Sequence, residues 1–167
     1  MHLLYLADIR LPLERANGIQ TMATCHALAG RGHTVTLLAR PDTAAEPRDP
    51  FAFYGLAPVP GFTIARTLSV GPPAVRRAEY LMAALRRSLG TPPPDVVFTR
   101  DLGVAALLAR LPRARRPALV YESHGYAPLV SDLLPVLLSG ASGPTTAKAR
   151  RLVRREKLAR MRLERHH

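Results

Sequence analysis

Three short polar segments of this 167-residue chain contain the residue types that bind or transform ligands. They are Asn17-Gly18, Thr99-Arg100-Asp101 and Glu122-Ser123-His124-Gly125-Tyr126, and each comes after a run of apolar residues. Amide, guanidinium and imidazole groups recognise phosphates and hydroxyl-rich ligands, and imidazole also transfers protons near neutral pH. The pattern predicts a ligand site built from the loops that follow strands.

The first segment precedes a helical pattern that begins at Ile19. Asn17 is a predicted N-cap with Gln20 three positions later, a capping-box spacing. Unpaired N–H groups at such a terminus favour a phosphate, and Gly18 allows its close approach. Asn-Gly is also a common turn dipeptide, so a purely structural turn is the alternative. The chain has no G-x-G-x-x-G, which disfavours a nicotinamide dinucleotide.

The second and third segments each follow a predicted strand. Arg100 is a candidate to hold a phosphate or hydroxyl-rich ligand, with a structural arginine as the alternative, and Asp101 is predicted to cap the next helix. His124 is the catalytic candidate, because a histidine at a strand's carboxyl end reaches into the crevice. A structural histidine is the alternative there. Ser123 lacks a G-x-S-x-G setting, so no Ser-His-Asp triad is predicted.

Cysteine and histidine usage excludes several classes of protein. The single cysteine, Cys25, rules out a disulfide framework and predicts a cytoplasmic protein. No group of cysteines and histidines has zinc-like spacing, so no metal site is predicted. Cys25 and His26 lie within a helical pattern, where packing roles are expected. The longest apolar stretch, residues 127–140, is too short to span a membrane and contains two prolines and an aspartate.

The positions of these segments depend on alternating strands and helices. A nearly continuous apolar strand is predicted at 2–7, a helix from 19 with a buried stripe of Met22, Cys25 and Ala29, and a second strand at 34–39. Later elements are a helical turn near 51–54, strands at 62–70, 95–99 and 118–122, and helices from 73 and at 102–111. The helix from 73 has its apolar stripe at Val75, Ala78, Met82, Leu85 and Leu89. This alternation predicts an α/β fold, a Rossmann-like open parallel sheet with helices on both faces.

Positive charge is concentrated at the C-terminus. Residues 148–167 contain nine basic and two acidic side chains, more than half of the chain's net charge of +12. Residues 1–140 are therefore predicted to form the folded domain, and residues 141–167 a linker and a basic helical tail. Such a helix packs on the body or on another domain, or contacts an anionic surface.

With these segments, the chain resembles the N-terminal domain of family 4 glycosyltransferases, which have two Rossmann-like domains (the GT-B architecture). The matching pieces are HLLYLAD at residues 2–8, ANGIQT at 16–21, LAGRGHTV at 28–35, VFTR at 97–100 and YESH at 121–124. The resemblance extends from Met1 to about Tyr126. It implies that the chain is one GT-B half.

The resemblance implies transfer of a sugar from a nucleotide-sugar donor to an acceptor hydroxyl, with retention of configuration and without a metal or other cofactor. Asn17 and Gly18 would lie near the donor diphosphate, and His124 near the transferred sugar. We expect Arg100, Glu122 and Tyr126 to contact substrate on the acceptor side. N–H groups would then stabilise the charge that develops on the leaving diphosphate.

Family members also have a second, donor-binding domain. We therefore expect this chain to be a truncated glycosyltransferase that needs a companion domain and has little activity alone. The alternative is a non-catalytic α/β module whose basic tail binds an anionic membrane or nucleic acid. The tail has no aromatic residues for base stacking, which favours peripheral membrane contact over nucleic acid.

Overall fold

The computed structural model describes residues 1–123 and Arg154. Within these residues five strands form one parallel sheet, in the order β3-β2-β1-β4-β5. The strands are β1 (His2–Arg10), β2 (Thr34–Arg40), β3 (Phe62–Arg66), β4 (Val96–Thr99) and β5 (Ala118–Tyr121). The helices are α1 (Ala16–Gly30), α2 (Pro50–Phe53), α3 (Pro73–Ser88), α4 (Leu102–Leu108) and a 3-10 turn, η1 (Arg113–Arg115). The predicted Rossmann-like α/β fold is confirmed.

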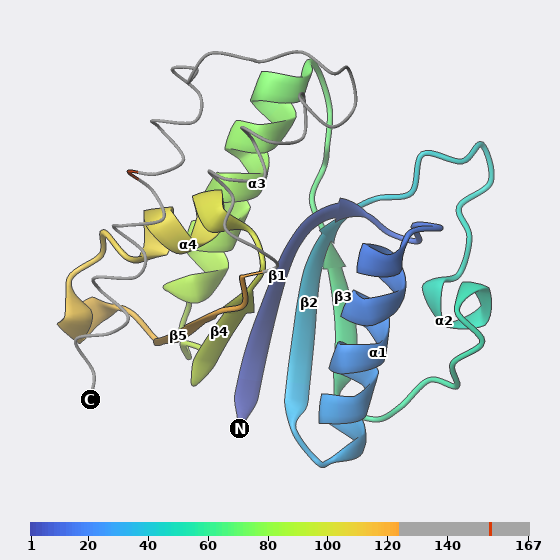
Figure 1. Ribbon diagram of the computed structural model, residues 1–167, viewed down its shortest axis with the longest axis horizontal. Helices are drawn as coiled ribbons and strands as arrows, with labels where there is room; N and C mark the ends of the chain where they lie inside the picture. Colours follow the sequence, from blue (N-terminus) through green and yellow to red (C-terminus); the bar gives the residue numbers. More distant parts are fainter. Residues whose placement is uncertain (124–153, 155–167) are drawn as a thin grey trace, which may run out of the picture.

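The strand order reverses at β1, which lies at the centre of the sheet (Figure 1). β2 and β3 follow on one side of β1, and β4 and β5 on the other. Leu6 of β1 pairs with both Leu38 of β2 and Thr99 of β4, so the carboxyl ends of these strands share one edge. In open parallel sheets, ligands bind in the crevice where the strand order reverses. The loops after β1 and β4 therefore border the natural binding position.

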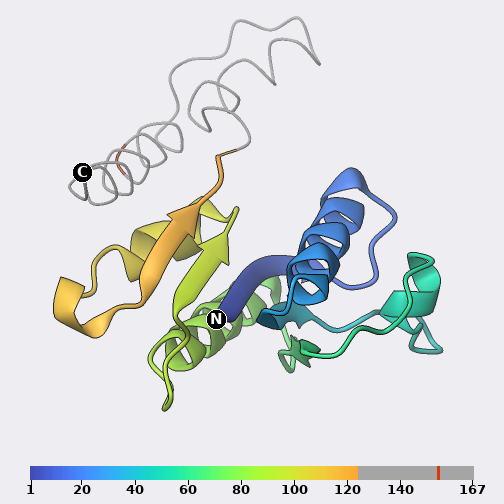
Figure 2. The same cartoon turned by 90° about the horizontal axis from the view of Figure 1, so that it is seen from below.

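Helices cover both faces of the sheet, as the alternation predicts. On one face α1 packs over β1 and β2, and its Cys25 is buried with Tyr5 in one core cluster. On the other face, Tyr80 of α3 and Val104 of α4 are buried with Leu6 in a second cluster. Figure 2 shows α1 and α3 on opposite sides of the central strands. Successive residues of β1 therefore contribute to different cores.

The start of α1 differs from the prediction. The N-cap is Arg15 without a side-chain capping bond, so the prediction that Asn17 caps the helix is wrong. Asn17 lies in the first turn, and the Gly18 N–H donates to the Arg15 carbonyl at 2.8 Å. β1 also extends to Arg10, because Leu11 continues the pairing by donating to the Arg40 carbonyl. The stripe of Met22, Cys25 and Ala29 is buried as predicted.

The buried face of α3 also differs from the prediction. Val75, Met82 and Leu89 are 54%, 51% and 42% exposed, whereas the buried residues are Tyr80, Ala84 and Ser88. The Tyr80 hydroxyl donates to the Leu38 carbonyl of β2 at 3.1 Å, which holds this face of α3 against the sheet. The buried Ser88 hydroxyl is satisfied within the helix, by donating to the Ala84 carbonyl at 2.8 Å. The spacing of apolar residues predicted the wrong buried face, because the face that is buried is partly polar.

The remaining elements follow the predicted order with shorter bounds. The expected helical turn is α2, the third strand ends at Arg66 rather than residue 70, and α4 ends at Leu108 rather than 111. In the predicted linker and tail, only Arg154 belongs to the described residues; it is helical and exposed. The rest of 141–167 lies outside them. None of the described helices is long and apolar enough to cross a membrane.

Candidate ligand-binding site

A cavity of about 150 Å³ lies where the strand order reverses, between the ends of β1 and β4 and the start of α1. Its lining residues are Tyr5, Leu6, Ala7, Asp8, Ile9, Asn17, Thr21, Arg100 and Asp101. Two of the predicted site residues, Asn17 and Arg100, therefore meet in one cavity although they are far apart in the sequence. The space suits a phosphate, a carboxylate, part of a sugar or a few water molecules.

Three buried polar atoms of this lining have no hydrogen-bond partner in the part of the chain that the structure describes. They are Tyr5 Oη, Thr21 Oγ1 and Arg100 Nη1. The two hydroxyls are near neighbours, since Thr21 acts to lower the pKa of Tyr5, but their geometry falls short of a hydrogen bond. An unsatisfied buried polar atom costs about 1–3 kcal/mol, and most are satisfied in native proteins. Three in one cavity indicate a position prepared for a polar ligand or for water. The two hydroxyls donate or accept, and the guanidinium donates only.

Arg100 is held in place by Glu122, which follows β5. Arg100 Nε donates to Glu122 Oε2 at 2.9 Å, and Nη2 donates to Oε1 at 3.0 Å. The arginine side chain is only 12% exposed, against 37% for the glutamate. This two-point contact fixes the plane of the guanidinium and leaves Nη1 at the cavity. Glu122 therefore holds Arg100 in this structure, and its expected contact with substrate stays a prediction.

Tyr5 lines the cavity, and Cys25 is buried in the core cluster that contains Tyr5. Burial raises the pKa of Tyr5 to about 12, although the positive charge of Arg100 acts in the opposite direction. Burial likewise raises the pKa of the Cys25 thiol. The Tyr5 ring stacks on Phe98 with ring centroids 4.9 Å apart, which fixes its hydroxyl. Both groups are therefore protonated at neutral pH, and Arg100 is the one basic group among the residues that line the cavity.

Glycine is required at position 18 for a structural reason that the sequence did not suggest. A Cβ at this position would lie 2.5 Å from both the Leu13 carbonyl oxygen and the Tyr54 hydroxyl. Tyr54 Oη donates to that carbonyl at 2.8 Å and accepts from the Leu13 N–H at 2.7 Å. The close approach that requires glycine is therefore an internal contact between the loop and α1. The role of Gly18 beside a donor diphosphate stays a prediction.

A network of ion pairs supports the cavity from the α3 side. The Asp8 carboxylate, only 5% exposed, accepts from both Arg40 and Arg77. Arg77 also binds both oxygens of Asp101 at 2.7 Å. Asp101 caps α4 by accepting from the Val104 N–H at 2.9 Å, which confirms the predicted cap. Through Arg77 of α3, the network joins the end of β1, at Asp8, to the loop after β4, at Asp101.

Electrostatics in this network keep the Asp101 carboxylate ionised. Burial acts to raise the pKa of Asp101, but hydrogen bonds from Arg77 and the helix N–H groups outweigh it and lower that pKa. The carboxylate hydrogen bonds and charges of Asp101 and Asp8 likewise raise the pKa of Arg77 against the effect of burial. In the part of the chain that the structure describes, no group of three or more His, Cys, Asp or Glu side chains is placed to hold a metal ion.

Sequence reasoning missed four of the residues just described. Tyr5 and Thr21 had a recognisable signal, since each is a hydroxyl residue in a buried pattern, Thr21 four positions before Cys25. Asp8 and Arg77 had none, because 69 positions separate them. His124 and Tyr126 lie outside the described residues, so their roles stay predictions.

An open parallel sheet with helices on both faces defines a Rossmann-like α/β domain. A family model described as "Glycosyl transferase 4-like domain" matches residues 18–163. Because the match covers most of the 167 residues, the chain belongs to this family of glycosyltransferase domains. Neither the curated proteins nor the solved structures compared with the chain give a match.

The matched range bears on two further predictions. It begins at Gly18, so β1 and Asn17 precede it although they line the cavity. It also continues through residue 163, across the predicted boundary between residues 140 and 141. That division into a domain and a tail stays a prediction.

Proposed function

We propose that this domain forms one side of the active site of a retaining glycosyltransferase, which moves a sugar from a nucleotide-linked donor to an acceptor hydroxyl. Family membership supports sugar transfer in general. The observation that carries the site assignment is the cavity with three unpartnered polar atoms at the reversal of strand order. A sugar or phosphate oxygen supplies the missing partners of all three atoms.

In the proposed reaction, the bond between the anomeric carbon and the donor diphosphate breaks, and a bond to the acceptor oxygen forms on the same face. The leaving diphosphate is then beside the acceptor and takes up its proton. Groups fixed in advance stabilise the charge that develops on the diphosphate. We assign this role to the Asn17-Gly18 end of α1, hydroxyl recognition to Arg100 and Tyr126, and contact with the transferred sugar to His124.

Glu122 and the enclosing walls have supporting roles in this proposal. Glu122 orients Arg100, so the guanidinium reaches the substrate without reorganisation. The described cavity is walled by β1, α1 and the loop after β4. We propose that a companion domain facing this edge holds most of the nucleotide, and that the reaction needs neither a metal nor another cofactor. The 167-residue chain alone would then transfer little sugar. We propose that the complete enzyme acts in the cytoplasm or at a membrane surface.

Calorimetric titration of the chain with UDP-glucose, GDP-mannose and ADP-glucose tests the site. We expect at least one to bind weakly, because the companion domain would hold most of the nucleotide. Arg100→Gln should weaken that binding about tenfold or more, as expected for a lost charge-assisted hydrogen bond. The matched control is Arg110→Gln, at an exposed arginine just after α4. Equal affinity of wild type and Arg100→Gln would refute the assignment. A radiolabelled transfer assay with substantial turnover by the chain alone would refute the companion-domain requirement.

The charge of residues 148–167 favours a second candidate, a non-catalytic module that binds an anionic membrane or nucleic acid. Flotation with anionic and with neutral vesicles, comparing the chain with a version ending at Gly143, separates the two functions. Tail-dependent flotation together with no nucleotide-sugar binding would favour the module. Nucleotide-sugar binding that survives removal of the tail would favour the transferase.

A further inference from the structure

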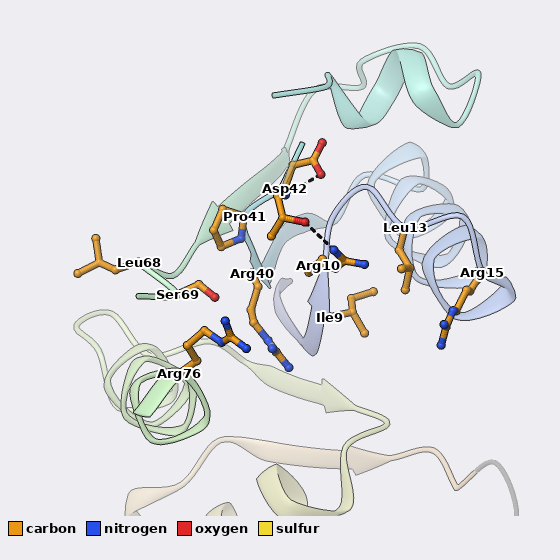
Figure 3. A pocket seen from close by; sticks show the side chains of 11 residues that line it. Ile9, Arg10, Leu13, Arg15, Arg40, Pro41, Asp42, Leu68, Ser69 and Arg76 are labelled. Carbon is orange, nitrogen blue, oxygen red and sulfur yellow. Dashed lines mark hydrogen bonds between the residues drawn. The ribbon is translucent and has the colours of Figure 1, made fainter. Parts of the chain in front are cut away.

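A second, larger hollow of about 630 Å³ lies at the same edge of the sheet, beyond the ends of β1 and β2 and beside the loop between β3 and α3. Four arginines line it: Arg10, Arg15, Arg40 and Arg76. They come from the end of β1, the loop before α1, the end of β2 and the first turns of α3. Figure 3 shows the guanidinium groups of Arg40 and Arg76 extending from two different elements into the space between them. None of these arginines belongs to the cavity described above.

The positive charge of this hollow is poorly compensated. Its one acidic lining residue, Asp42, is bound by Arg48, with Nε–Oδ2 at 2.8 Å and Nη2–Oδ1 at 3.1 Å. The hydrogen bond from Arg48 holds the pKa of Asp42 well below its usual range. Arg40 shares the Asp8 carboxylate with Arg77. Asp42 is therefore already neutralised from outside the hollow.

Three of the four arginines, Arg10, Arg15 and Arg76, have no ion pair among the residues that the structure describes. Arg15 is exposed, and Arg76 is half-buried with its Nε enclosed and without a hydrogen-bond partner. Arg10 donates to the Thr43 hydroxyl, a neutral partner. Guanidinium groups that line one hollow from several elements suit a group with several negatively charged oxygens, as phosphate has. The volume of the hollow also accommodates the molecule that carries the phosphate.

An apolar lip borders these arginines. Leu68 lines the hollow and is 81% exposed, while Val70 and Val75 nearby are 71% and 54% exposed. Leu68 and Val70 belong to the loop between β3 and α3, and Val75 to the first turn of α3. The loop is anchored, since the Glu79 carboxylate accepts the N–H groups of Leu68 and Ser69. A fixed loop that exposes apolar side chains beside positive charge suits an amphipathic ligand.

We propose that the hollow lined by Arg10, Arg15, Arg40 and Arg76 binds a phosphate group of the sugar acceptor. This rests on the proposed transferase function, because it assigns the donor to the smaller cavity and the acceptor to the hollow. The phosphate belongs to a soluble phosphate ester or to a lipid headgroup, and the apolar lip provides contact for the lipid case. The acceptor oxygen then approaches the donor along the shared edge of the sheet.

Calorimetric titration with sn-glycerol 3-phosphate tests the phosphate site without needing sugar transfer. We expect binding that weakens with added salt, and about tenfold weaker binding for Arg15→Gln and for Arg76→Gln. Arg15→Gln keeps the test valid if Arg76→Gln destabilises the fold, because Arg15 is exposed. Arg86→Gln, at an exposed position late in α3, is the matched control and should bind like wild type. Wild-type affinity in both pocket variants would overturn the proposal.

Two further measurements separate the sources and the two sites. The first is flotation of wild type and Arg15→Gln with phosphatidylcholine vesicles, with and without phosphatidic acid. Flotation that requires both phosphatidic acid and Arg15 identifies a lipid acceptor. If Arg15→Gln weakens glycerol 3-phosphate binding but does not change flotation, the acceptor is a soluble phosphate ester. Complete displacement of glycerol 3-phosphate by UDP-glucose would assign the hollow to the donor and overturn the acceptor assignment. Phosphate binding without any nucleotide-sugar binding would refute the transferase proposal and leave the phosphate site standing.

Discussion

The small cavity and the arginine hollow share one edge of the sheet but are built on different physical principles. The cavity has one arginine, held at two points by Glu122, with two buried hydroxyls beside it. The hollow has four arginines and exposed apolar side chains. Buried, fixed donors discriminate by geometry, because a misplaced ligand leaves them unpaired. Exposed charges attract over a longer range and are screened by salt.

This difference assigns separate tasks to the two regions. A fixed donor set suits the part of a substrate where bonds change, since its groups need no reorganisation during the reaction. A wide, charged hollow suits recognition of a substrate at a distance from the reacting bond. Asp8 connects the regions, because it lines the cavity and binds Arg40 of the hollow.

Removing Asp8 should have the largest effect, since it affects both regions at once. Asp8→Ala leaves Arg40 and Arg77 without their shared carboxylate. We expect a loss of about 3 kcal/mol in the free energy of unfolding, measured by urea denaturation. Glu14→Ala is the control, because the Glu14 side chain is 76% exposed and its ion pair with Arg48 should contribute less than about 1 kcal/mol. Equal effects of the two substitutions would contradict this account of Asp8.

Gly18→Ala should have the next largest effect on stability, because Gly18 packs against the loop that separates the cavity from the hollow. The added Cβ meets the Leu13 carbonyl and the Tyr54 hydroxyl at 2.5 Å, and Leu13 lines the hollow while the adjacent Asn17 lines the cavity. We expect a loss of about 1–3 kcal/mol in thermal or urea unfolding. Gly30→Ala is the matched control at the other end of α1, where a Cβ has open space and should be neutral or slightly stabilising. A Gly18→Ala variant as stable as wild type would show that this contact relaxes freely.

Changes at Tyr5 should have the smallest effect on stability, because this side chain lines the cavity and not the hollow. Its pKa of about 12 in the folded protein, against 10.0 in its ordinary state, means that the unfolded chain loses the proton first as pH rises. Stability is therefore unaffected by Tyr5 below about pH 10 and falls between about pH 10 and 12, by about 1–2 kcal/mol. Tyr5→Phe should remove this part of the pH dependence, measured as the difference from wild type because the pKa of Tyr80 is also raised by burial.

The same substitution also separates the cavity from the hollow. At neutral pH, Tyr5→Phe removes an unpartnered hydroxyl, so stability should be unchanged or slightly higher. Nucleotide-sugar binding should weaken, while glycerol 3-phosphate binding should not change. Weaker phosphate binding and unchanged nucleotide-sugar binding would reverse the two assignments.

Local patterns predicted the parts of the fold that depend on neighbouring residues. The apolar run at the N-terminus and the β-branched segment at 34–39 became the paired strands β1 and β2. Asp101 caps α4 as expected, because capping involves residues only three positions apart. The sequence failed at α3, where Tyr80, Arg77 and Ser88 face inward through polar partners that apolar periodicity does not register.

The sequence by itself determined the alternation of strands and helices, and with it which loops reach the binding edge, since periodicity and turn residues act over short distances. Only the tertiary structure decided that Tyr5, Thr21 and Arg100 leave unpaired atoms in one cavity, and that four arginines converge beside it. Both features depend on strand order and on contacts between residues far apart along the chain. Local patterns do not encode such contacts, because burial and pairing are set when the sheet and helices pack together.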